Sequence, residues 1–127
     1  MIFEIMGPTG TENVHLGMSK NVLRRSLGNF REFRRAPTSP PSDQFLAAGL
    51  MATYDPQDRV VLIEFAEPAS PRLVGLALLG LSTDRLGDLL SKIGLASTAE
   101  DDAVLVPSWH MSFYAPDGVV EGVLLGE

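Results

Sequence analysis

The sequence predicts an α+β fold made of two pseudo-symmetric β-α-β-β-β halves, with helices packed on one face of an antiparallel sheet. The first observation is an approximate repeat: the segment LGMSKNVLRRSLG at Leu16–Gly28 is similar to LGLSTDRLGDLLSKIG at Leu79–Gly94. The second is a pair of related segments, LMATYDPQDRVVLIEF at Leu50–Phe65 and HMSFYAPDGVVEGVL at His110–Leu124. Segments of two kinds that recur in the same order indicate an internal duplication.

Each repeated phrase carries the start and stop signals of a helix. Ser19 can cap the first helix, because its hydroxyl can accept a hydrogen bond from a backbone N–H of the first turn. Met18 and Leu23 are spaced as a hydrophobic staple, and Gly28 can end the helix in the left-handed conformation. The second phrase repeats these positions with Leu81, Ser82, Leu86 and Gly94. A buried stripe is predicted at Leu86, Leu89, Leu90 and Ile93.

Short candidate strands complete each half. They are Ile2–Ile5, Phe30–Arg35, Leu73–Leu78 and Ala103–Val106, in addition to the two hairpins. The spacing of Phe30 and Phe33 also fits a helical turn. Two prolines in Ala66–Arg72 predict a seam, so residues 1–66 and 73–127 are expected to be halves of one domain joined by a linker at 67–72. Ala36–Asp43 reads as a Pro/Ser loop without a counterpart.

Alternation within the hairpins predicts which side chains are buried. The predicted core consists of Val61, Ile63, Phe65, Leu86, Leu90, Ile93, Val120 and Leu124. The bulky set Trp109, Met111 and Phe113 is expected to face this core, which leaves His110, Ser112 and Tyr114 outside. Alignment of the two hairpins adds Leu50, Ala52, Tyr54, Leu62, Glu64 and Glu121 to the outward set.

Composition limits the classes of function. Of the 127 residues, 45% are hydrophobic and 20% are charged, which is ordinary for a globular protein. The longest apolar run, Leu73–Leu81, is about half as long as a membrane-spanning helix. No signal-peptide pattern and no cysteine are found, so we expect a cytoplasmic protein without disulfides or membrane contact. A net charge of −6 argues against nucleic-acid binding, although residues 1–35 hold six basic and three acidic residues. This asymmetry fits either a solvated surface or the electrostatic steering of a partner.

No motif fixes a reaction, so we expect no enzymatic activity, no catalytic residues, no metal site and no cofactor. His15 and His110 are the only histidines, and neither occurs in a zinc-ligand spacing. Gly75–Ser82 matches the glycine spacing of a phosphate-binding loop, but Leu81 stands where that loop needs lysine. The acidic run Glu100–Asp102 lacks the alternating ligands and the glycine of a calcium loop.

The repeated phrase resembles the repeat of the β-lactamase-inhibitor-protein and BamE-like group. The matching positions are Gly17, Ser19, Val22, Leu27 and Gly28, and then Gly80, Ser82, Leu86, Ile93 and Gly94. The resemblance implies a short helical segment against an antiparallel sheet, which the inhibitor protein carries in tandem. The inhibitor family is secreted and disulfide-bonded and BamE is a lipoprotein, whereas this chain has no cysteine. In size and charge the chain is also similar to the small immunity proteins that neutralise bacterial toxins.

These observations favour a protein-binding module, most concretely an immunity or inhibitor protein that occludes the active site of a bacterial toxin or enzyme. Its predicted partner-binding residues are Tyr54, Glu64, His110, Tyr114 and Glu121, on the outward face of the sheet. Exposed aromatic side chains are common at binding hot spots, and carboxylates can meet a basic partner. Two alternatives stay open: a small-molecule-binding protein with a pocket between the halves, and an assembly module that forms homodimers through sheet edges.

Overall fold

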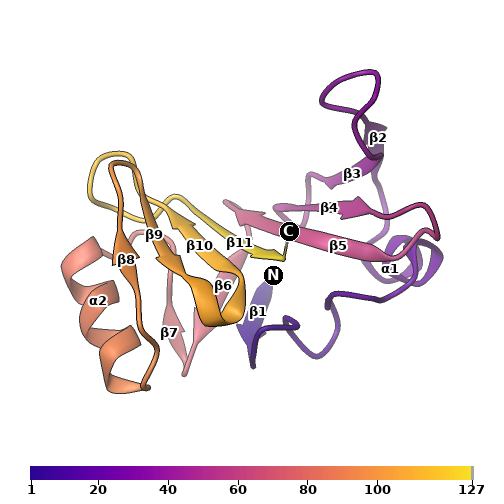
Figure 1. Cartoon of the computed structure of the whole chain (residues 1–127). Coiled ribbons are helices and arrows are strands. Elements are labelled where there is room, and N and C mark those ends of the chain that lie inside the picture. The colour runs from indigo at the N-terminus through magenta and orange to yellow at the C-terminus, as the bar shows by residue number, and fades with distance from the viewer. Residues whose placement is uncertain (127) are drawn as a thin grey trace.

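The computed structural model describes residues 1–126 and is built on one large antiparallel sheet (Figure 1). Its strands follow one another in the order β2 (Arg31–Phe33), β3 (Ser42–Phe45), β4 (Leu50–Tyr54), β5 (Val60–Ala66), β11 (Gly122–Gly126), β10 (Met111–Tyr114), β9 (Ala103–Val106) and β8 (Thr98–Ala99). A second sheet contains β1 (Ile2–Ile5), β6 (Ser70–Leu73) and β7 (Leu76–Ala77), in that order. The helices are α1 (Lys20–Leu27) and α2 (Thr83–Lys92), and a 3-10 turn covers Pro107–Trp109. The α+β class is confirmed.

Both helices begin where their capping serines predict. The Ser19 hydroxyl accepts a hydrogen bond from the Val22 N–H at 3.2 Å, and the Ser82 hydroxyl accepts one from the Arg85 N–H at 3.3 Å. The two helices have 8 and 10 residues. Neither of these helices, the two in the described chain, is long and apolar enough to cross a membrane.

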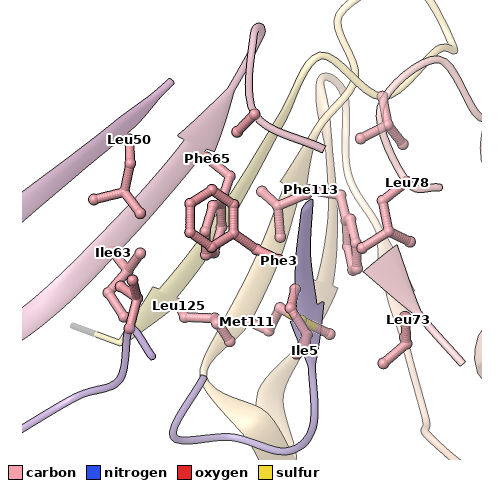
Figure 2. Close-up of a cluster of buried hydrophobic side chains, with 14 of the residues drawn as sticks. Phe3, Ile5, Leu50, Ile63, Phe65, Leu73, Leu78, Met111, Phe113 and Leu125 are labelled. Carbon is pink, nitrogen blue, oxygen red and sulfur yellow. The ribbon is translucent and has the colours of Figure 1, made fainter. Parts of the chain in front are cut away.

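The hydrophobic core lies between the two sheets. Phe3 of β1 packs on Phe65 of β5, with ring centroids 5.2 Å apart. Figure 2 shows Phe3 and Ile5 of β1 among side chains of the large sheet, including Met111. The side chains buried from the large sheet are Phe45, Leu50, Ala52, Tyr54, Val60, Ile63, Phe65, Val104, Val106, Met111, Phe113, Val123 and Leu125. They alternate along their strands with partly exposed residues, so one face of this sheet is covered by the rest of the chain.

Most of the predicted core is buried, and three predicted members are not. Ile63, Phe65, Leu86, Leu90 and Val120 are buried as predicted. Val61 is only partly buried because the ladder between β4 and β5 shifts by one residue there and pairs Tyr54 with Val60. Leu124 points to the opposite face because Val123 and Leu125 supply the buried positions of β11. Ile93 lies at the end of α2 and is partly exposed.

The outward phase predicted for β4 is wrong. Leu50, Ala52 and Tyr54 are each at most 2% exposed and belong to the core. The prediction aligned Tyr54 with Tyr114, but Tyr114 pairs with Gly122 and faces outward. A one-residue difference between the two hairpins reverses the face of every side chain in the strand.

Two predicted connections contain strand residues, and one predicted strand is interrupted by a turn. The predicted linker at 67–72 includes the start of β6, which pairs in parallel with β1. Pro71 is tolerated because Phe3, its partner in the register, lies beside the N–H and C=O groups of Ser70 and Arg72. The predicted strand Leu73–Leu78 turns at Val74 and Gly75, which have positive φ angles of 51° and 75°. The predicted loop Ala36–Asp43 ends inside β3, a strand that the sequence patterns did not reveal.

Truncation on the two faces of the large sheet will have different costs. We expect Phe65→Ala to lower the free energy of unfolding by about 3–5 kcal/mol, because it leaves a cavity beneath Phe3. Leu124→Ala, a matched truncation on the other face, is expected to cost less than about 1 kcal/mol. Denaturant unfolding measures both values, and equal costs would show that the two faces have been assigned wrongly.

Candidate protein-binding face

The side chains that alternate with the core form the second face of the large sheet, which we call the open face. Pairing between strands places Leu105, Ser112, Leu124, Glu64, Met51 and Gln44 in one row. Leu62 and Thr53 are cross-strand partners in a neighbouring row. All eight residues are partly exposed, and the leucines and the methionine make half of them apolar. The open face therefore spans six strands, and four of them contribute apolar side chains.

The opposite face of this sheet is covered by the small sheet and α1. Phe3 of the small sheet packs on Phe65, as described above. Arg24 of α1 contacts Asp43 of β3, whose register partner is the buried Ala52. Because both contacts involve inward-facing side chains, they leave the open face to other occupants.

An ion pair lies at the centre of the open face. Glu64 has Leu124 and Met51 as its cross-strand neighbours, and its carboxylate binds the guanidinium of Arg35. Arg35 follows β2, so the connection between β2 and β3 must bend toward the sheet centre for this contact to form. Arg34 donates a hydrogen bond to the Ser39 carbonyl at 2.8 Å and ties this connection together. In Figure 1 the hairpin formed by β2 and β3 rises from one end of the large sheet.

A cavity of about 440 Å³ lies where β5, β11 and the turn before β10 meet. It is lined by Pro8, Leu16, Val60, Val61, Trp109, His110 and Gly126. His110 has a left-handed backbone with φ 47° and ψ 43°, and its carbonyl accepts a hydrogen bond from the Gly126 N–H. His110 therefore belongs to a turn and not to the strand in which it was predicted.

The structure separates the five predicted site residues. Glu64 and Tyr114 lie on the open face, and Tyr114 is 55% exposed. His110 is exposed beside the 440 Å³ cavity. Glu121 is exposed and borders a different cavity, together with Glu67. Tyr54 is buried, so its prediction as an accessible binding residue is wrong.

Tyr54 instead belongs to a buried polar cluster that sequence reasoning missed. The carboxylate of Asp43, which has no exposed side-chain surface, accepts hydrogen bonds from the Tyr54 hydroxyl at 2.7 Å and from the Arg24 Nε at 2.7 Å. A second Arg24 nitrogen donates to the other oxygen of Asp43 at 2.9 Å. Arg24 also stacks on Phe30, 4.0 Å from the ring centroid. No sequence motif indicated this cluster, because its members come from a helix and two strands.

The cluster has a structural role. Desolvation and the hydrogen bond to Asp43 raise the pKa of Tyr54 well above its ordinary value, so the phenol stays protonated and donates its hydrogen bond. The hydrogen bond to Asp43 likewise raises the pKa of the Arg24 guanidinium, which remains charged. Among residues 1–126, no group of three or more metal-binding side chains could hold a metal ion. Comparisons of the chain with protein-family models, with characterised proteins and with solved structures found no match.

We expect Asp43→Asn to lower the free energy of unfolding by about 3 kcal/mol, the lower end of the cost of breaking a buried ion pair. The lower end applies because the Arg24 side chain remains 21% exposed. Asp101→Asn removes the same charge from an exposed turn and serves as the control. Thermal and denaturant unfolding measure the difference, and equal stability of the two variants would contradict a structural role for Asp43.

The raised pKa of Tyr54 predicts a loss of stability at alkaline pH. The unfolded chain releases the tyrosine proton near pH 10, whereas the folded protein retains it. The stabilisation is therefore complete below about pH 10 and decreases as the pH rises further. Tyr54→Phe should make the unfolding free energy less dependent on pH in this range, and Tyr114→Phe, which changes the exposed tyrosine, should not. Denaturant unfolding across the alkaline range distinguishes the two variants.

Proposed function

We propose that this chain is a non-enzymatic protein-binding module that uses its open face to occlude the active site of a bacterial toxin or enzyme. The observation that carries this proposal is the apolar half of the open face, Met51, Leu62, Leu105 and Leu124, on a sheet whose other face is covered. Half-buried leucines gain free energy when a partner removes their remaining exposed surface from water.

The dimensions of the open face suit a protein partner. Eight strands spaced about 4.8 Å apart give a width of about 34 Å, and strands of about four residues give a length of about 13 Å. The product is about 440 Å², and the hairpin between β2 and β3 adds further surface. A protein interface of ordinary size buries about 800 Å² on each partner, so the open face and its border can supply most of this area.

Charge supports a basic partner. The chain carries a net charge of −6, and Glu64 lies at the centre of the open face among apolar neighbours. Arg35 pairs with Glu64 within this chain. A lysine or arginine of a toxin active site can take the place of Arg35, because a carboxylate in apolar surroundings binds a guanidinium strongly.

We also propose that the chain consists of two pseudo-symmetric halves, each with its helix on the covered face. Three backbone hydrogen bonds of the first half have counterparts in the second half, and these pairs support the duplication. In the first half, the N–H groups of Gly17, Val60 and Lys20 donate to the carbonyls of Val60, Met18 and Asp58 at 2.7, 3.0 and 2.9 Å. In the second half, the N–H groups of Gly80, Val120 and Thr83 donate to the carbonyls of Val120, Leu81 and Gly118 at 2.8, 2.9 and 3.0 Å. In an experimental structure, residues 15–66 should superpose on 78–125. Helices in unrelated positions would contradict the duplication.

The 440 Å³ cavity supports a second candidate function, the binding of a small apolar molecule. It draws Leu16 and Val61 from the first half of the sequence and Trp109 from the second. Its volume lies within the range of small-molecule sites, about 300–1,000 Å³. Quenching of the fluorescence of the single tryptophan, Trp109, by a panel of apolar ligands tests this candidate.

Substitutions on the open face test the main proposal. Leu124→Arg puts a charge into the apolar row, so it should weaken binding of a captured partner at least about tenfold, or about 1.4 kcal/mol, with little change in the melting temperature. Val74→Arg makes the same kind of change at an exposed position in the turn between β6 and β7, and should bind like the unaltered protein. Calorimetry with the purified partner gives the affinities. If Leu124→Arg also retains full affinity, the partner does not use the open face.

A further inference from the structure

The outer edge of β1 differs from the other sheet edges of the described chain. β1 has four residues and ends the small sheet, whereas β7 at the other end has two. The edges of the large sheet are the three-residue β2 and the two-residue β8. Short edge strands and charged side chains protect sheets from pairing with other chains. β1 is longer, contains no proline, begins at the exposed Ile2 and is followed by the exposed Met6.

The backbone of β1 directs hydrogen-bonding groups toward this outer edge. The Ser70 N–H donates to the Met1 carbonyl at 2.9 Å, so alternation points the peptide groups of Phe3 and Ile5 at β6 as well. The N–H and C=O groups of Ile2 and Glu4 therefore point away from β6. These are the groups that an added strand would bind.

A groove of about 360 Å³ lies beside the same edge. β1 forms one side, and the other is formed by Ser26 and Leu27 of α1 together with residues 11–14. Among residues 1–126, the ionisable side chains that line the groove are those of Glu4 and Glu12. A groove of this volume bounded by α1 suits one extended segment better than a second folded copy of the chain, and its two carboxylates favour a basic segment.

We propose that the groove beside β1 binds an extended basic peptide segment of another protein, which adds to β1 as a further strand. Backbone hydrogen bonds to Ile2 and Glu4 supply the pairing. Alternate lysine or arginine side chains of the peptide lie on the exposed face of β1 and approach Glu4 and Glu12, while the apolar ones lie on the opposite face, toward Phe3 and Leu27. β1 belongs to the layer that covers the opposite face of the large sheet, so this site is separate from the open face and does not depend on its function.

A titration with defined peptides tests the proposal. The probes are a short peptide of alternating valine and lysine, the corresponding valine–glutamate peptide, and a valine–lysine peptide N-methylated on every residue. Two-dimensional NMR of the whole chain should show binding of the first peptide with a Kd below about 1 mM, through shifts of the Ile2 and Glu4 amides. The other two peptides should not bind, because one has the wrong charge and the other cannot pair as a strand.

Matched variants separate charge at the groove from charge elsewhere. Glu4→Gln with Glu12→Gln should weaken binding of the valine–lysine peptide about fivefold. Asp101→Asn with Asp102→Asn removes the same charge at the turn between β8 and β9 and should leave the affinity unchanged. Equal binding of the acidic or the N-methylated peptide, no binding at all, or dimerisation of the chain through β1 would each overturn the proposal.

Discussion

Packing of the small sheet against the large one is the constraint on which the architecture depends. Phe3 and Ile5 of β1 reach the core between Phe65, Met111 and other side chains of the large sheet (Figure 2). Side chains alternate between the two faces of a strand. Once one face of the large sheet is packed against the small sheet, the face to which each side chain points is therefore fixed. The open face follows from this packing, because its leucines occupy the strand positions that alternate with the core residues and point to the other face.

At one end of the sheet, a polar cluster takes the place of apolar packing. Asp43 has Arg24 and Tyr54 as partners, and together they join α1 to β3 and β4. Burying a carboxylate costs free energy, but its hydrogen bonds satisfy both oxygens, and the loss of one partner would leave the others unpaired. The cluster thus fixes the position and orientation of α1 on the sheet, because hydrogen bonds are directional and apolar contacts are not.

Features that depend on neighbouring residues in the sequence could be predicted, whereas features that depend on pairing between distant strands could not. Helix caps at Ser19 and Ser82 depend on neighbouring residues, so both helix starts could be predicted. β3 was missed because its two buried polar residues, Ser42 and Asp43, are stabilised by partners distant in sequence. Tyr54 was assigned to the wrong face because the hairpins differ by one residue, and a strand's phase reverses with such a shift. Of the predicted site, Glu64 and Tyr114 therefore share the open face and Tyr54 does not.

The central claim is that the open face is accessible in the free protein and is covered when a partner binds. The chain has no cysteine, so single-cysteine variants report on one position each. Reaction of a thiol reagent should be fast with Leu124→Cys and slow with Ile63→Cys, which replaces a core residue. Addition of the captured partner should slow labelling of Leu124→Cys, while Val74→Cys continues to react. A Leu124→Cys variant that is unreactive in the free protein, or equally reactive with and without partner, would contradict the account.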